Sequence, residues 1–156
     1  MGYCRWSDIL FKTKKWDQKY NFKNAKKEKD YTTLQIITCI HNDEEKARNR
    51  AKKTLSFYIS VGKIYREFLQ STGYSAETKI LYDEYRKVGL NGLEKFIPEK
   101  MLDDLCIAGT PDTAVKKLNT FRDAGINLPI IQFNPIGNVK ESFELLTKTF
   151  SGELNE

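Results

Sequence analysis

Five residues could take part in chemistry: His41, Asn134 and Pro135, which follow predicted strands, and Gly109 and Thr110, which start a predicted helix. His41 is the only histidine, and its imidazole can donate a hydrogen bond to a cofactor or substrate oxygen, or shuttle a proton. Gly109 and Thr110 open a predicted helix, whose amino end can bind an anion through its backbone amides. The sequence has no recognisable metal-ligand, nucleophile-elbow or phosphate-loop motif. These residues therefore indicate a binding site rather than a self-contained catalytic group.

Each of these residues also has a purely structural interpretation. A histidine in a turn between a strand and a helix is commonly a solvated or capping residue. Thr110 can cap the following helix by accepting the amide of Thr113. Asn134 and Pro135 can form a turn ahead of the last helix. The residue types alone leave both interpretations open.

Two predicted strands must position His41, Asn134 and Pro135. Residues 34–40 are β-branched and apolar, and residues 128–133 form an apolar run typical of a strand that is buried on both faces. A capped helix over residues 111–124 and Gly125 precede the second strand, with Gly125 predicted to adopt the left-handed conformation. Helix, glycine and strand make half of a βαβ unit, so we expect a parallel sheet. The carboxyl ends of the two strands would bring His41, Asn134 and Pro135 to one edge.

Apolar periodicity predicts four further helices. A long helix over residues 44–70, capped by Asn42 or Asp43, is expected to bury Ala47, Ala51, Leu55, Tyr58, Val61, Tyr65 and Phe68. A helix over residues 76–88, capped by Ser75, is expected to bury Ile80, Leu81, Tyr85 and Val88. A third starts at Pro98 and buries Met101, Leu102 and Leu105, and the last, capped by Asn138, places Val139, Phe143, Leu146 and Phe150 on one stripe.

Composition favours a globular protein of the cytoplasm. Hydrophobic residues make up 40% of the chain and charged residues 30%, and no apolar run approaches the ~18 residues of a membrane span. The three cysteines, Cys4, Cys39 and Cys106, are widely spaced and fit neither a disulfide framework nor a zinc site. Cys39 and Cys106 are expected to be small core residues, as in a reducing compartment.

The net charge of +5 is concentrated at the amino end. Residues 1–30 hold nine Lys or Arg against four Asp or Glu, whereas residues 31–156 hold seventeen of each. Aromatic residues between the lysines could support nucleic-acid binding, but the near absence of arginine argues against it. We therefore divide the chain into a basic segment (1–30), a main domain (31–150) and a polar tail (151–156). Residues 8–11 could add a strand to the sheet.

An ordered set of motifs resembles the luciferase-like monooxygenase superfamily. The set comprises the acidic helix start at residues 42–48, the aromatic pair 57–58, the Ile-Pro-Glu segment within 96–103, Gly-Thr-Pro-Asp at 109–112 and Asp-Ala-Gly-Ile at 123–126. The resemblance runs from about residue 34 to residue 150, and it is strongest to the F420-dependent, methylenetetrahydromethanopterin reductase-like branch.

The resemblance implies a fold, a cofactor and a reaction. Members of this superfamily are (β/α)8 barrels of about 250 residues, whereas this chain has 156. The expected fold is therefore a helix-rich α/β partial (β/α)8 TIM barrel, the C-terminal portion, with its last two parallel strands and their helices. The family implies coenzyme F420 or FMN bound at the barrel mouth, where His41, Asn134 and Pro135 are expected. It also implies hydride transfer to or from a small-molecule substrate, or activation of oxygen.

The short length leaves alternatives to an active oxidoreductase. The chain could be a truncated relative whose missing N-terminal barrel half is encoded separately, or it could form a homodimer. It could instead be a non-catalytic interaction or scaffold protein derived from the barrel. A nucleic-acid binder using the basic amino end is a third hypothesis, distinguished by a salt-dependent affinity.

Overall fold

Three parallel strands form the centre of the computed structural model, which describes residues 31–152. They are β1 (Thr33–Ile40), β2 (Cys106–Gly109) and β3 (Leu128–Phe133), in the order β2-β1-β3. Thr33 of β1 lies opposite Leu128 of β3, and Ile37 lies opposite Cys106 of β2. β1 is thus the middle strand, and the predicted pairing of residues 34–40 with residues 128–133 is confirmed.

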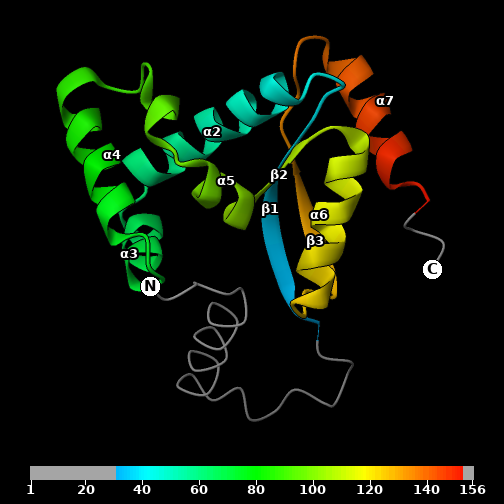
Figure 1. Cartoon of the computed structure of the whole chain (residues 1–156), viewed down its shortest axis with the longest axis horizontal. Helices are drawn as coiled ribbons and strands as arrows, with labels where there is room; N and C mark the ends of the chain where they lie inside the picture. Colours follow the sequence, from blue (N-terminus) through cyan, green and yellow to red (C-terminus); the bar gives the residue numbers. More distant parts are fainter. Residues whose placement is uncertain (1–30, 153–156) are drawn as a thin grey trace.

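Along the chain, most of the helices come between β1 and β2. They are α2 (Glu44–Val61), α3 (Lys63–Ser71), α4 (Ser75–Val88), the short 3-10 helix η1 (Leu93–Phe96) and α5 (Glu99–Leu105). α6 (Pro111–Asp123) joins β2 to β3, and α7 (Val139–Phe150) follows β3. α2 runs away from the sheet, so that α3 and α4 lie at its far end (Figure 1).

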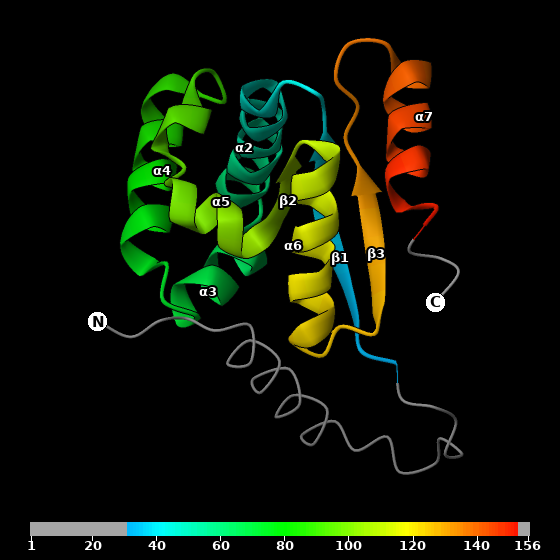
Figure 2. The same cartoon turned by 45° about the vertical axis from the view of Figure 1, so that its right-hand side comes forward.

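Helices cover both faces of the sheet. Ile37 and Cys39 of β1 pack with α2 and α5 in one buried cluster, whereas Ile36 and Ile40 pack with α6 and α7 in another. Figure 2 shows α2 and α5 on one side of the strands and α7 on the other. A (β/α)8 barrel holds its helices in one outer ring. The described part therefore differs from a segment of barrel with helices on its outer face alone. The predicted partial TIM barrel is confirmed only as a helix-rich α/β fold with a parallel sheet.

β2 is a strand that the sequence analysis missed. It has four residues and begins directly after α5, and the sequence analysis predicted no strand between the helix from Pro98 and the helix from Pro111. Length is what separates a buried strand from a buried helix end, and four residues are too few to decide. Pairing with the carboxyl half of β1 is what makes this segment extended.

The prediction of one helix over residues 44–70 was wrong, because Gly62 divides it. Gly62 has the extended angles φ −91° and ψ 97°, and a Cβ built there would lie 2.7 Å from the Tyr58 carbonyl oxygen. Because of this break, the residues of α3 that face the core differ from those that a continuous helix would bury. Val61 is 48% exposed and Phe68 36% exposed, while Leu69 is buried instead.

Four other residues predicted to face inward are exposed: Ile80, Val88, Val139 and Phe143. α4 contacts α2, α3 and η1 at one end of the molecule, so a narrow stripe that includes Thr78 and Leu81 suffices to bury it. α7 lies at the other end and buries Ser142 and Phe150. The predicted Ser75 cap was also wrong, because the helix begins at Ser75 and no side chain caps it.

β3 is not buried on both faces, contrary to the prediction. Leu128 is 46% exposed and Ile130 is 49% exposed. β3 is an edge strand of the described sheet. Near its carboxyl end, Gln132 is hydrogen-bonded to Tyr58 of α2. The apolar run therefore identified the strand correctly but not its surroundings.

The helix caps were predicted well. Asp43 accepts the amide of Lys46, and Thr110 accepts that of Thr113. Asn138 caps α7, and Gly125 has the predicted positive φ, 100°. Cys4, the basic segment and the strand predicted at residues 8–11 lie outside the described residues. Within the described part, no helix is long and apolar enough to span a membrane.

Cys39 and Cys106 are fully buried, as predicted. Burial raises the pKa of the Cys39 thiol to about 12 and also raises that of Cys106. Because the thiolate is the reactive form, we expect a Cys4→Ser variant to show no thiol reaction with Ellman's reagent at pH 8. Two thiols per chain should react after denaturation in urea. A native thiol that reacts as fast as free cysteine would contradict this burial.

Candidate functional site

The carboxyl edge of the sheet brings the five predicted residues together. His41 follows β1, Gly109 ends β2 and Thr110 follows it, and Asn134 and Pro135 follow β3. The amide of His41 donates to the Gly109 carbonyl at 3.1 Å, which extends the pairing of β1 with β2. The amide of Asn134 donates to the carbonyl of Thr38 at 3.1 Å, which does the same for β1 and β3. We call these five residues the carboxyl edge.

The His41 side chain combines a structural role with a ring nitrogen that has no hydrogen-bond partner among residues 31–152. It is half-buried, and its Nδ1 accepts the amide of Asp43 at 2.9 Å. This bond fixes the turn into α2. A neutral ring that accepts at Nδ1 carries its proton on Nε2. The Nε2–H group can therefore donate to a ligand oxygen at this edge.

Gly109 and Thr110 serve the start of α6. Gly109 has φ +153°, and a Cβ built there would lie 2.9 Å from the Thr113 Cγ2. A glycine is therefore required at this close approach. The Thr110 hydroxyl oxygen lies 3.4 Å from the Thr113 amide nitrogen that it caps and 3.1 Å from the Thr113 hydroxyl. The structure thus supports the capping interpretation of Thr110.

Asn134 and Pro135 are tied to α2. Asn134 is buried, its Oδ1 accepts from the Thr54 hydroxyl at 2.9 Å, and its Nδ2 donates to the Gln132 carbonyl at 2.8 Å. The Pro135 carbonyl accepts from Arg50 Nε at 3.3 Å. The side chain of Asn134 therefore holds the loop after β3 in place, with both ends of its amide engaged.

The sequence analysis missed a polar stripe of α2 that faces this loop. Arg50 Nη1 donates to the Thr54 hydroxyl at 2.6 Å, and Gln132 Nε2 donates to the Tyr58 hydroxyl at 3.0 Å. Arg50, Thr54 and Tyr58 follow one another at intervals of four residues, so they lie on one face of the helix. That spacing was visible in the sequence, although only Tyr58 was assigned to the buried face.

Arg50 stands out among the cations of α2. It is half-buried, and within residues 31–152 it forms no ion pair with a carboxylate. Arg48 and Lys52, by contrast, pair with Glu99 and Asp103 of α5. An arginine whose bonds reach only a carbonyl and a hydroxyl keeps its charge available for an anionic ligand group.

Ion pairs link α2 to α5 through residues of α2 that flank Arg50. Arg48 Nη1 donates to Asp103 Oδ1 at 2.9 Å, and both Arg48 and Lys52 bond to Glu99. The bonds from Lys52 and Arg48 lower the pKa of the Glu99 carboxyl. This cluster fixes α2, and with it Arg50, relative to the sheet.

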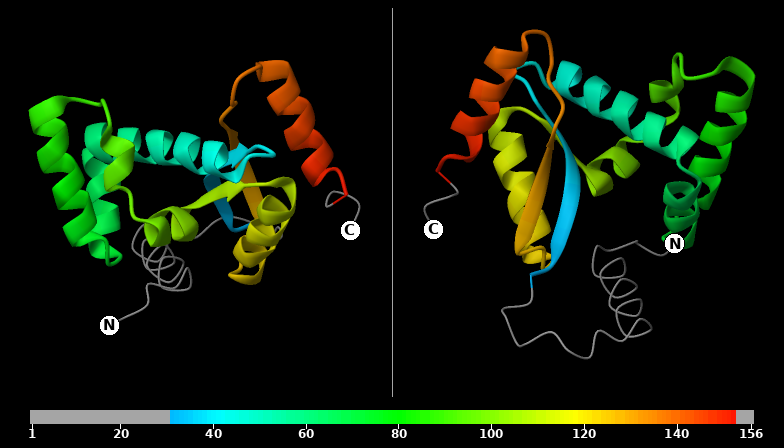
Figure 3. Two further views of the ribbon diagram at one scale, coloured as in Figure 1. Left: turned by 45° about the horizontal axis from the view of Figure 1, so that its top comes forward. Right: turned by 180° about the vertical axis from the view of Figure 1, so that it is seen from behind.

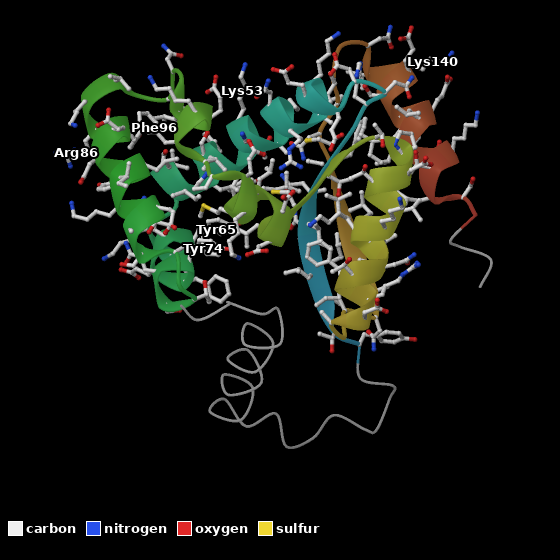
Figure 4. The ribbon with its side chains drawn as sticks, in the orientation of Figure 1. Lys53, Tyr65, Tyr74, Arg86, Phe96 and Lys140 are labelled. Atoms are coloured by element: carbon white, nitrogen blue, oxygen red, sulfur yellow. The ribbon has the colours of Figure 1, made fainter. Side chains whose placement is uncertain are left out.

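Other surfaces offer less. The part of the chain that the structure describes contains no cluster of three or more His, Cys, Asp or Glu able to hold a metal. A cleft of about 320 Å³ lies between α2 and the turn before η1, and no residue of the carboxyl edge lines it. Lys53 of α2 and Lys140 of α7 extend from the upper side of the molecule, whereas Arg86 extends from the outer side of α4 (Figure 4).

Comparison with known families settles the ancestry of the chain. A family model described as "Luciferase-like monooxygenase" matches residues 15–128. The chain belongs to this family. The match confirms the predicted resemblance, and it extends that resemblance into the first thirty residues of this luciferase-like protein.

Two relatives show how much of a luciferase-like protein this chain matches. The chain is 27% identical over 113 residues to 5,10-methylenetetrahydromethanopterin reductase of Archaeoglobus fulgidus, covering 70% of this chain and 34% of that protein. Its fold is similar to the coenzyme F420 dependent tetrahydromethanopterin reductase from Methanopyrus kandleri, with a TM-score of 0.63 at 20% identity. That likeness covers 79% of this chain and 35% of the other. The chain thus spans about a third of the length of each relative.

The ion-pair cluster predicts a pH-dependent stability. Because the pKa of Glu99 is lowered from its ordinary value of 4.5, its contribution is present at neutral pH and is lost as the pH falls through the lowered value. We expect Glu99→Gln to reduce the free energy of unfolding at pH 7 by up to about 1 kcal/mol, because Glu99 is largely exposed. The difference should shrink as the pH falls below 4.5, as measured by urea denaturation.

Glu67→Gln is the matched control, because Glu67 lies 3.8 Å from Lys63 in a single exposed pair. It should change stability little at neutral or acidic pH. An equal loss in both variants at pH 7 would contradict the special role of the cluster.

Proposed function

We propose that this luciferase-like chain takes part in F420-dependent hydride transfer and contacts its cofactor or substrate at the carboxyl edge. Family membership supports the oxidoreductase class. The observation that carries the choice of site is Arg50, a half-buried cation without a carboxylate partner in residues 31–152, held beside the loop after β3. Ligands of open α/β sheets bind outside the carboxyl ends of the strands.

Two donors, His41 at the carboxyl edge and Arg50 of α2 beside it, fit a flavin-like cofactor that carries oxygen acceptors and negative charge. Arg50 would hold an anionic group, and His41 Nε2–H would donate to a ring or substrate oxygen. Asn134 and Thr110 take no such part in this proposal, because their polar atoms hold the loop and the helix start. When bound, the cofactor supplies or accepts the hydride. The name of the M. kandleri relative specifies coenzyme F420 and not FMN.

We further propose that β1 and β3 occupy neighbouring positions in the larger barrel of the relatives. Their parallel register and the TM-score of 0.63 support this placement. The small-molecule substrate of such an enzyme would then approach the same edge as the cofactor.

A non-catalytic interaction protein remains the second candidate. The observation that favours it is the exposure of Leu128 and Ile130 on an edge strand, since exposed apolar strands invite pairing or packing. Cofactor binding separates the two candidates.

Titration of the purified chain into coenzyme F420, followed by cofactor fluorescence, tests the proposal. We expect saturable binding that Arg50→Ala weakens by roughly tenfold or more, the usual value of a hydrogen bond to a charged group. His41→Ala should weaken binding by less, because it removes one neutral donor. A parallel titration with FMN measures selectivity.

Arg86→Ala is the matched control, because it removes the same charge from the outer side of α4 (Figure 4). It should leave the F420 affinity unchanged. Absence of binding by a cooperatively folded chain, or an equal loss in both arginine variants, would contradict the proposal and favour an interaction protein.

A further inference from the structure

The cleft of about 320 Å³ between α2 and the turn that joins α4 to η1 combines apolar and charged side chains. Lys53 and Phe57 line it from α2, and they share one face of the helix because they are four residues apart. Leu90, Asn91 and Glu94 line it from the facing wall. Figure 3 shows η1 alongside α2. We call this space the outer cleft.

Two apolar side chains of the outer cleft remain in contact with solvent. Phe57 is 45% exposed and Leu90 is 46% exposed, although they line the same cleft from opposite walls. The walls themselves are fixed, because Leu55 of α2 and Leu93 of η1 are fully buried and the two helices pack together. A ligand with an apolar group between Phe57 and Leu90 would remove apolar surface of both from water.

The charged groups of the outer cleft have opposite signs and lie on opposite walls. Within residues 31–152, the Lys53 ammonium and the Glu94 carboxylate form no hydrogen bond or ion pair. The neighbouring Lys95 does not neutralise Glu94, since its ammonium lies 5.0 Å from the centre of the Phe96 ring. Glu94 is half-buried. A carboxylate that is partly removed from water gains from a cationic partner.

We propose that the outer cleft binds a free α-amino acid with a large apolar side chain. The carboxylate of the ligand pairs with Lys53, its ammonium pairs with Glu94, and its side chain lies between Phe57 and Leu90. The amide of Asn91 provides a further hydrogen-bonding group. A fatty acid or one end of a peptide carries only one of the two charges. The volume suits a small ligand, because small-molecule sites begin at about 300 Å³.

This proposal is independent of the cofactor hypothesis, because no residue of the carboxyl edge lines the outer cleft. Titration of the isotope-labelled chain with L-phenylalanine, followed by NMR, tests it. We expect saturable shifts of the amides of Phe57, Asn91 and Glu94. N-acetyl-L-phenylalanine lacks the ammonium and L-phenylalaninamide lacks the carboxylate. Each should bind about fivefold more weakly than L-phenylalanine, the upper value for an ion pair that is open to solvent.

Two variants assign the two charges. Glu94→Gln should weaken the binding of L-phenylalanine and of its amide by about fivefold, and leave that of the N-acetyl compound unchanged. Lys53→Met should weaken the binding of L-phenylalanine and of the N-acetyl compound, and leave that of the amide unchanged. Lys140→Met is the matched control, because it removes the same charge from α7, at a distance from the cleft (Figure 4). It should change none of the three affinities.

Three results would overturn the proposal. One is the absence of saturable shifts with both L-phenylalanine and L-leucine, and another is binding that neither Glu94→Gln nor Lys53→Met changes. The third is an equal affinity for L-phenylalanine and its N-acetyl derivative, which would assign the cleft to apolar anions such as the carboxyl end of a peptide. Circular dichroism checks that each variant is folded, and replacements of these cleft-lining side chains should leave the core intact.

Discussion

The parallel pairing of β1 on both sides is the constraint from which the other features follow. Parallel strands cannot be joined by a tight turn, so a long excursion must connect them. Here the excursion from β1 to β3 includes α2 to α6 and the short strand β2. Because β1 is shared, one face of it packs against α2 and α5 and the other against α6 and α7. The same pairing sets His41 beside Gly109 and Asn134 beside Thr38.

Features that depend on a few neighbouring residues could be predicted from the sequence. The caps at Asp43, Thr110 and Asn138 are local hydrogen bonds, and the structure contains all three. Features that depend on distant contacts could not. The four residues of β2 are extended because β1 lies beside them, and the break at Gly62 decides which apolar residues of α2 and α3 meet the core. Neither effect is visible in the apolar spacing.

The candidate site divides in the same way. Strand ends identified the positions of His41 and Asn134, because parallel strands end at one edge. The roles of these side chains depend on α2, which engages Asn134 through Thr54 and places Arg50 against the Pro135 carbonyl. Arg50 could not be singled out in the sequence, because α2 contains several cations. In the structure, Arg48 and Lys52 differ from Arg50 in that they pair with carboxylates of α5. Family membership indicates the chemistry, while these contacts indicate where a ligand would be held.

Hydrogen exchange of the native chain, followed by NMR, tests the central pairing most directly. The amides of His41 and Asn134 lie just beyond the strands and donate to Gly109 and Thr38. If β1 pairs on both sides, these two amides should be protected together with those of residues 36–40 and should be released at the free energy of global unfolding. Exchange of both amides at the rate of an unstructured peptide, in a chain whose helices remain protected, would contradict the account.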